Sequence, residues 1–420
     1  MSVFERTVLS NGVRVITTPM GHVQSTACYL MLQAGSRYET AQENGVAHFV
    51  EHVMFCGTPR RPSVTALTGE VDAMGGRFNA ATGKEYTFYY VKCASEYAPR
   101  ALDVLADMLR NSLFDATEVE REKAVIIEEI RAKFDVPSDY VDENFELLIY
   151  GDTPLGRLRI GSEASVTAMT RETLVDFAGR MYEPSRLVVG LAGRIDAGLQ
   201  DTVEDLLGEF AGSRAPEAPP LKRVDGARRV LLDSKPVDQA HLCLGVRAHP
   251  LTHPDRYAVE LLATVLGGGM SSRLNDELVM RRGLAYTVFS EAHSHTDAGS
   301  VYAQGGVNVD KVDEAIAVIR DELQRLADEL VGDDELAKAR NYAKGSFVFS
   351  TETPQGLVMH ALGDEVLAGQ IRQPDDVLAG LDAVTADDVR RTARDILGGG
   401  LYLSIVGPFD DPDRFERLIS

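Results

Sequence analysis

Two histidines and a glutamate lie within one helical turn of each other in residues 44–59 of this 420-residue chain. His48 and His52 are four positions apart on a helix predicted over residues 45–56, so both imidazoles project from one face. At this spacing two imidazoles can bind one zinc ion. Glu51 is displaced around the helix and would lie beside the metal, where it could take a proton from a bound water molecule.

The order His-x-x-Glu-His reverses the commoner order of metallopeptidase motifs. With nine histidines in 420 residues, a chance match somewhere in the chain has odds of roughly one in a hundred. The competing interpretation is a pair of core histidines with Glu51 at the rim of a helix–sheet core. Three ionisable groups are costly to bury in an apolar helix without partners, so the pattern favours a metal site.

A second helix, predicted over residues 116–133, offers the carboxylate that a site with two histidines still needs. Glu122 and Glu129 are seven residues apart on this helix and share a face. Glu129 is the candidate third zinc ligand, and Glu122 is a candidate neighbour that orients a ligand. Without the histidines, the glutamates of this helix would form an acidic solvated face, which stays the better interpretation for most of them.

Composition limits the classes of protein. With 44% hydrophobic and 25% charged residues the chain is typical of a globular protein, and its length predicts at least two domains. A net charge of −21 excludes nucleic acid as the expected partner, because phosphates would be repelled. The absence of a long apolar run and of a signal peptide predicts no membrane span and a cytoplasmic location. The four widely spaced cysteines are expected to be free thiols.

The order of predicted strands and helices recurs with a period near 210 residues, which indicates a duplicated domain. Proline-containing residues 213–223 look like a linker between a domain over 1–212 and a domain over 224–420. The helix of the second copy that matches 45–56 carries Glu260 and no histidine. One domain would therefore bind the metal and the other would not.

Motifs along nearly the whole chain resemble the pitrilysin/insulysin family of zinc peptidases, the inverzincins. The nearest branch is that of the short two-domain bacterial enzymes and the mitochondrial processing peptidase subunits. The matching residues are Gly35-Ser-Arg-Tyr-Glu39, Gly45-Val-Ala-His-Phe-Val-Glu-His52, Gly57-Thr58, Asn79-Ala-Ala-Thr82, Glu122 with Glu129, and Gly283-Leu-Ala-Tyr-Thr-Val288. The resemblance implies one zinc ion per chain, with His48, His52 and Glu129 as ligands and Glu51 as the base.

The resemblance also implies a fold and a mode of substrate binding. The fold would be α+β, with two duplicated αβ domains, each an antiparallel-rich sheet covered by helices on one face. Two such chains would pair as a clam-shell dimer around a chamber that admits unfolded peptides. Asn79 and Ala80 match the edge strand to which a peptide substrate adds through main-chain hydrogen bonds. Tyr286 matches a tyrosine of the second domain that reaches the substrate.

One position departs from the family pattern. The family normally has an arginine seven residues before this tyrosine, and here that position holds Val279, with Arg281 and Arg282 shortly after it. Three interpretations stay open: Arg282 belongs to the family background and the site is incomplete, Arg281 substitutes through a local shift, or a different partner chain supplies the arginine–tyrosine pair. We favour the last, because losing a donor aimed at transition-state charge costs about 3 kcal/mol.

The leading hypothesis is a zinc endopeptidase that cleaves short or unfolded peptides, as a homodimer or as a heterodimer with a related chain. The rival hypothesis is a non-catalytic or half-site subunit whose partner completes the active site. Within the enzyme class, general peptide degradation and the maturation of one peptide product fit the sequence equally.

Overall fold

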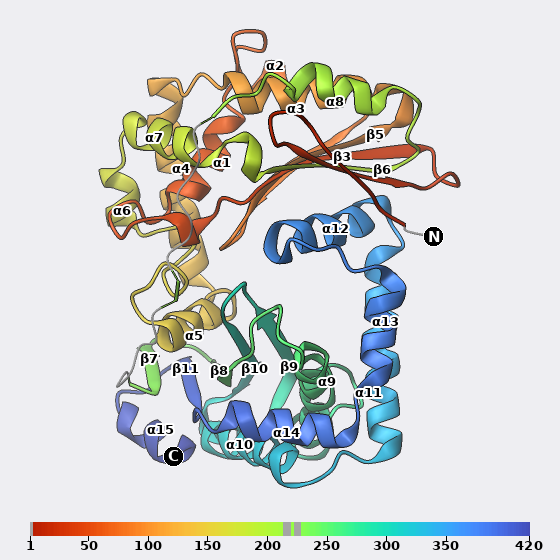
Figure 1. The fold of residues 1–420 in the computed structure, drawn as a ribbon. Helices are drawn as coiled ribbons and strands as arrows, with labels where there is room; N and C mark the ends of the chain where they lie inside the picture. The colour runs from red at the N-terminus through yellow and green to blue at the C-terminus, as the bar shows by residue number, and fades with distance from the viewer. Residues whose placement is uncertain (1–2, 213–219, 222–227) are drawn as a thin grey trace. The chain divides into compact units, whose positions relative to one another are not determined.

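The computed structural model describes residues 3–212, 220–221 and 228–420, and the chain divides into two compact units of three segments each (Figure 1). Unit 1 comprises Met1–Arg131, Leu158–Pro219 and Phe349–Gln373, and unit 2 comprises Ala132–Arg157, Pro220–Val348 and Pro374–Ser420. Relative to the domains expected from the sequence, residues 132–157 and 349–373 belong to the opposite unit. Most of the expected linker over 213–223 lies outside the described residues.

Unit 1 is built on a six-stranded sheet with the order β1-β2-β6-β3-β5-β4. Its strands are β1 (Glu5–Val8), β2 (Arg14–Pro19), β3 (Ser25–Leu32), β4 (Arg77–Thr82), β5 (Thr87–Ala94) and β6 (Leu187–Gly193). Only the β2–β6 pair is parallel. The central strands β3 and β6 are almost fully buried, which explains why they are continuous apolar runs. Strand β4 is an edge of the sheet, and its burial alternates along most of its length.

The helices of unit 1 cover both faces of this sheet. They are α1 (Val46–Met54), α2 (Val64–Asp72), α3 (Ala98–Asn111), most of α4 (Ala116–Asp135), α6 (Glu163–Ala168), α7 (Arg171–Met181), α8 (Leu199–Leu207) and α12 (Pro354–Ala368). Helix α3 packs on β3 and β5 with α8 beside it, whereas α12 packs on the opposite face (Figure 1). At Gly190 of β6 a Cβ atom would lie 2.7 Å from Leu362 of α12, so this face admits α12 closely.

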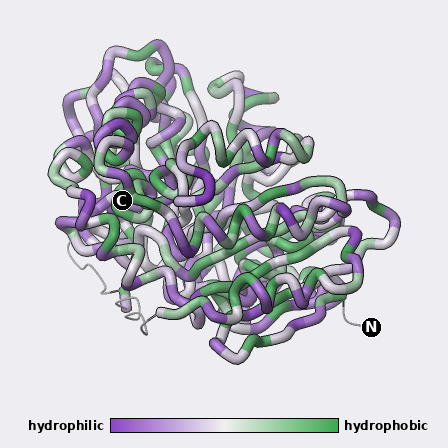
Figure 2. Tube along the Cα trace, turned by 90° about the horizontal axis from the view of Figure 1, so that it is seen from above, coloured by the Kyte–Doolittle hydropathy of each residue, from purple (hydrophilic) through white to green (hydrophobic). Residues whose placement is uncertain are grey.

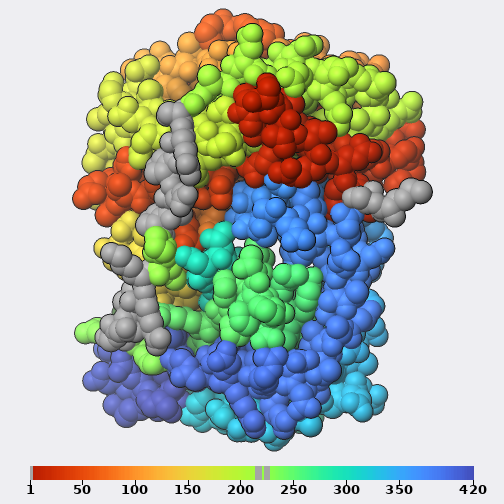
Figure 3. Space-filling view, viewed as in Figure 1, coloured from red at the N-terminus to blue at the C-terminus, as the bar shows by residue number. Residues whose placement is uncertain are grey.

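Segments distant in sequence meet at the edge of unit 1. The Asn11 side chain, in the turn of the first hairpin, donates hydrogen bonds to the carbonyl oxygens of Leu207 (2.7 Å) and Phe210 (2.9 Å). The red N-terminal hairpin and the yellow-green residues near α8 accordingly adjoin on the surface in Figure 3. These bonds fasten the first hairpin to the end of α8.

Unit 2 repeats the plan with a five-stranded sheet of order β7-β11-β8-β10-β9. Its strands are β7 (Val230–Ser234), β8 (Gln239–Ala248), β9 (Ala285–Ser294), β10 (Gly299–Asn308) and β11 (Tyr402–Gly407). Its helices are α5 (Val141–Tyr150), α9 (Arg256–Gly267), α10 (Val312–Asp328), most of α11 (Asp333–Thr351), α13 (Pro374–Ala383), α14 (Ala386–Leu397) and α15 (Pro412–Ile419). Only the β7–β11 pair is parallel, and β9 is an edge strand.

The predicted α+β fold with two antiparallel-rich sheets is confirmed, but helices cover both faces of each sheet and not one face as expected. In unit 2, α9, α10 and α14 share one large apolar core, while α5 packs against Cys243, Tyr302 and Tyr402 in a separate one. Each sheet thus has helices of its own half on one face and a single helix from the other half of the chain, α12 or α5, on the second face. Hydrophilic and hydrophobic residues alternate along the helices (Figure 2), as this layering requires.

Two further sequence expectations can be compared with the structure. All four cysteines are buried free thiols, as expected. Among the described residues, none of the helices combines the length and the apolar character needed to cross a membrane.

Candidate metal centre

The structure brings the three predicted ligands together in unit 1. Glu129 Oε2, on α4, lies 3.8 Å from His48 Nε2 and 3.6 Å from His52 Nε2, both on α1. The centroids of the two imidazole rings are 4.6 Å apart at an interplanar angle of 66°, and the ligand atoms of the three residues all lie within 4.8 Å of one another. In a tetrahedral zinc site with bonds of about 2.0–2.1 Å, ligand atoms are about 3.4 Å apart. The two nitrogens and one oxygen therefore fit a zinc ion and leave a position for a further ligand.

The second nitrogen of His52 faces Glu122, the residue that was expected to orient a ligand. His52 Nδ1 lies 3.2 Å from Glu122 Oε2, and the Glu122 side chain is largely buried beside it. A carboxylate in this place favours the tautomer in which Nδ1–H donates a hydrogen bond to it and Nε2 can bind a metal. The contact also restrains the orientation of the His52 ring.

Glu51 lies next to these groups without joining them. Desolvation raises the pKa of Glu51, and a hydrogen bond from Thr82 together with the nearby His52 imidazole opposes the rise. Thr82 Oγ1 donates to Glu51 Oε2 at 2.6 Å. The carboxylate is therefore half-buried, held through one oxygen, and adjacent to the candidate metal position.

The buried Glu39, which belongs to the sequence motif over residues 35–39, fixes the start of the histidine helix. Gly45, at the N-cap of α1, has φ +97°, which favours glycine, and offers no side chain to cap the helix. Glu39 does so instead, since its carboxylate accepts the backbone N–H groups of Gly45 (2.8 Å) and Ala47 (2.9 Å). Asn44 also donates to it, at 3.1 Å. Desolvation raises the pKa of Glu39 to about 7.

The same segment ties α1 to the β4–β5 hairpin. A Cβ atom at Gly35 would lie 2.5 Å from the carbonyl oxygens of Gly83 and Lys84, so only glycine permits this approach. Arg37 and Glu85 form a buried ion pair at 2.8 Å. The motif over residues 35–39 thus joins the hairpin at one end and the histidine helix at the other, a role that its glycine and alternating charges could have signalled.

The predicted substrate-binding residues lie on the edge strand β4. Asn79 is exposed and Ala80 is half-buried, and the register pairs them with Tyr90 and Tyr89 of β5. Within the described residues, β5 is the one strand that pairs with β4, so its other edge is open to a further strand.

The predicted residues of the second domain lie in unit 2. Tyr286 is 89% exposed near the start of β9. Val279 lies in the π-helical segment Asn275–Arg281 and packs against the apolar core of unit 2. Arg281 pairs with Asp276 and Glu277, and Arg282 pairs with Glu277 and Glu314; all four ion pairs lie near the surface.

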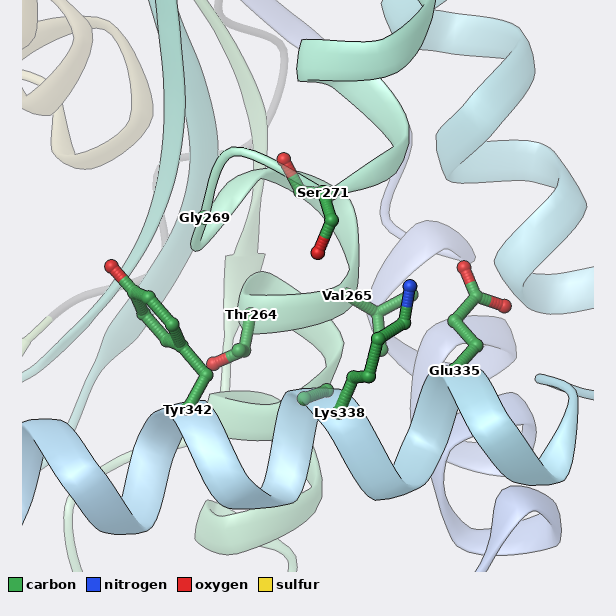
Figure 4. A pocket seen from close by; sticks show the side chains of 9 residues that line it. Thr264, Val265, Gly269, Ser271, Glu335, Lys338 and Tyr342 are labelled. Carbon is green, nitrogen blue, oxygen red and sulfur yellow. The ribbon is translucent and has the colours of Figure 1, made fainter.

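In unit 2 the helices equivalent to α1 and α4 are α9 and α11, and they line a cavity with side chains of a different kind. Figure 4 shows Thr264 and Val265 of α9 opposite Glu335, Lys338 and Tyr342 of α11, around a cavity of about 40 Å³. Within the described residues, groups of three potential metal ligands occur at His48, His52 and Glu129, at Cys56, Glu118 and Glu122, and at His249, His253 and Asp255. None of these groups includes residues of this cavity.

The cluster around His249 in unit 2 lacks the geometry of a metal centre. The rings of His249 and His253 are stacked 3.8 Å apart at an angle of only 13°. A metal must lie in the plane of each ring that binds it, and two nearly parallel rings share no such position. Asp255 is moreover held by Arg391 through two hydrogen bonds of 2.7 Å.

Two histidines on one helix, a glutamate from a second helix and a neighbouring carboxylate outside this set are typical of a metallopeptidase site. Family models agree: "Insulinase (Peptidase family M16)" matches residues 14–163, and "Peptidase M16 inactive domain" matches residues 168–342. The chain belongs to the insulinase family, peptidase family M16.

Relatives named as zinc proteases support peptidase activity and zinc for this family branch. An uncharacterized zinc protease of Streptomyces coelicolor is 38% identical over 97% of this chain and 90% of its own length. One of Bacillus subtilis is 33% identical over 96% of this chain and 98% of its own length.

Solved structures share the fold. A protease from Helicobacter pylori has a TM-score of 0.89 at 20% identity, covering 97% of this chain and 100% of its own. A peptidase M16 inactive domain from Pseudomonas fluorescens has a TM-score of 0.88 at 18% identity, covering 97% and 98%.

Proposed function

We propose that this protein is a zinc endopeptidase that cleaves short or unfolded peptides. The observation that carries the proposal is the convergence of His48, His52 and Glu129, with Glu51 beside them and outside the ligand set. A structural ion-pair cluster would not need two imidazoles with converging nitrogens, nor a further carboxyl group held outside the set.

In this proposal each residue has a separate role. His48, His52 and Glu129 hold one zinc ion, which when bound supplies Lewis-acid activation of water and of the scissile carbonyl group. Glu51 accepts the proton of the attacking water and delivers it to the leaving amine. Glu122 keeps His52 in the tautomer and orientation that binding requires.

The substrate would bind as an additional strand along β4. Main-chain groups around Asn79 and Ala80 would pair with an extended peptide, which explains the preference for unfolded segments. The exposure of Tyr286 supports a role in contacting substrate rather than in the core. In the proposal, pairing of two chains around a chamber excludes folded proteins.

The second candidate is a half-site subunit, and Val279 is the observation that favours it. Val279 is partly buried and packs against the core of unit 2, and the guanidinium groups of Arg281 and Arg282 are engaged by acidic neighbours. Both guanidinium groups are thus already engaged in ion pairs within the chain and are not directed at a substrate. A related chain with an arginine at the position of Val279 would then complete the site. Mixing the two chains would raise turnover strongly, whereas a self-sufficient enzyme would show no change.

Replacement of Glu51 tests the proposed function directly. Glu51→Gln should lower kcat on a quenched fluorescent peptide by about 10²–10⁴-fold, because the variant loses its proton acceptor. Zinc content, measured by mass spectrometry of the metal, should remain at one per chain. Glu260→Gln on the equivalent helix α9 is the matched control and should retain full turnover. Unchanged turnover in Glu51→Gln with zinc retained would refute the proposal.

A further inference from the structure

The hydrogen bond between Thr82 and Glu51 joins the edge strand β4 to the histidine helix. At 2.6 Å it has the short distance typical of a hydroxyl group that donates to an ionised carboxylate. Thr82 is 6% exposed, so water does not compete for the bond. Because threonine is branched at Cβ, its side chain has few rotamers and its hydroxyl group has a defined direction.

We propose that Thr82 is a positioning residue for the peptidase reaction, whose hydroxyl group holds one oxygen of Glu51 so that the other oxygen faces the attacking water. The inference rests on the proposed function and deepens it. It assigns to the edge strand a second task beside substrate binding, namely setting the direction of the base.

The position of Thr82 is determined by the hairpin rather than by α1. Thr82 pairs with Thr87 at the end of the β4–β5 ladder, and Gly83 N–H closes the hairpin on Tyr86 O at 2.7 Å. The Thr87 hydroxyl is engaged elsewhere, since it donates to Ala34 O at 2.7 Å. The hairpin therefore presents the Thr82 hydroxyl at a fixed place.

One face of β4 is directed at α1 along its length. Phe78, Ala80 and Thr82 alternate with more exposed residues, as expected from the two-residue period of a strand. At one end of this face the Phe78 ring packs 4.7 Å from the Phe55 ring at the end of α1. At the other end Thr82 contacts Glu51. Strand and helix are thus held at two points, one apolar and one polar.

Glu51 needs such a restraint because glutamate has several rotatable bonds. An unrestrained side chain would sample positions away from the water. A bond to a rigid strand selects one of these positions before the substrate arrives.

Two substitutions at Thr82 separate positioning from packing. Thr82→Val keeps the shape and removes the hydroxyl group, and should lower kcat about 10–100-fold with KM nearly unchanged. Thr82→Ser keeps the hydroxyl group and loses a methyl group, and should retain most of kcat. If Thr82 only fills space, Thr82→Ser is the more damaged variant, which would overturn the inference. Thr202→Val, which removes a hydroxyl group bonded within α8, is the matched control.

A readout independent of activity completes the test. Crystal structures of the zinc-loaded wild type and Thr82→Val should show Glu51 in a different rotamer in the variant, with His48, His52 and Glu129 unmoved. In the Glu51→Gln background, Thr82→Val should cause no further loss of kcat, because both act through one group. An unmoved Glu51 overturns the inference even if the peptidase proposal stands. A wild type that loads zinc and hydrolyses no peptide overturns the peptidase proposal, while the rotamer still decides the role of Thr82.

Discussion

The two units place equivalent helices beside equivalent strands and differ in what fills the junction. In unit 1, α1 contacts the edge strand β4; in unit 2, α9 contacts the edge strand β9. The junction in unit 1 holds the Phe55–Phe78 ring pair and the Thr82–Glu51 hydrogen bond. In unit 2 a Cβ atom on Gly267 would lie 2.5 Å from the backbone nitrogen of Ser290, so helix and strand touch through their backbones.

This difference shows how one fold carries chemistry in one copy and not in the other. In unit 2 a cavity of about 430 Å³ lies at the α9–β9 junction, and Glu260, Glu291 and His293 are among its lining residues. Space for polar groups is therefore present, but no group of three potential metal ligands among the described residues lines it. The second helix α11 carries Ala339 and Ser346 where α4 carries Glu122 and Glu129. The architecture positions the site, but the side chains at the junction make it.

The strongest test of the comparison is metal binding. His52→Ala should abolish zinc binding, because it leaves one imidazole and one carboxylate where a catalytic zinc site needs three protein ligands. The double variant of His249→Ala and His253→Ala, in the stacked pair of unit 2, should keep one zinc ion per chain. Zinc per chain is measured after dialysis against a weak chelator. Loss of zinc in the unit 2 variant would reverse the assignment of the two histidine pairs.

A smaller effect is expected from the carboxylate behind the metal centre. Glu122→Gln should weaken zinc affinity about 10–100-fold, since the amide no longer favours the Nε2-binding tautomer of His52. Competition with a chromogenic chelator measures this affinity. Glu120→Gln, exposed on the same helix, should bind zinc like the wild type. Equal affinities in all three proteins would show that Glu122 does not support the site.

Glu39, which caps α1, and Asp255, the N-cap residue of α9, should contribute to stability with opposite dependences on pH. Burial raises the pKa of Glu39 from an ordinary value of 4.5 to about 7, so its contribution to stability is present below pH 4.5 and lost as the pH rises through 7. Hydrogen bonds from Arg391 lower the pKa of Asp255, so its contribution is present above the ordinary value of 3.8 and lost as the pH falls through the lowered pKa.

Urea unfolding of the wild type, Glu39→Gln and Asp255→Asn measures these contributions. Between pH 4.5 and pH 8 the advantage of wild type over Glu39→Gln should fall by up to about 3 kcal/mol. The advantage over Asp255→Asn should instead be constant in this range and decline below pH 4. A pH-independent difference for Glu39→Gln would show that its carboxyl group titrates as an exposed acid does.

The sequence indicated which residues could converge on a metal more fully than it indicated the residues that hold them in place. The His48–Glu51–His52 spacing gives a defined geometry on any helix, and the seven-residue spacing of Glu122 and Glu129 allowed one carboxylate to reach each side of His52. Glu39 and Thr82 act across contacts between separate elements, which no local periodicity encodes. Both residues belong to motifs that can be recognised in the sequence, but the sequence alone gives neither residue a physical role.

The sheet layers were predicted in part for a similar reason. Strand alternation and the repeat near 210 residues reveal two sheets with helices. They do not reveal that α12 covers the sheet of unit 1 or that α5 covers the sheet of unit 2, because helices with an apolar stripe do not specify which sheet they join. The roles of Asn79, Ala80, Tyr286 and Arg282, the pairing of chains and the cytoplasmic location stay predictions.

The exchange of α12 and α5 between the halves has a consequence for synthesis of the chain. The last strand of the first sheet, β6, ends at Gly193, but the helix that covers one apolar face of that sheet ends at Ala368. At about 5–20 residues per second the ribosome needs on the order of ten seconds or more to supply it. During that interval the nascent first half presents an uncovered apolar surface, so its maturation depends on sequence that lies beyond the midpoint of the chain.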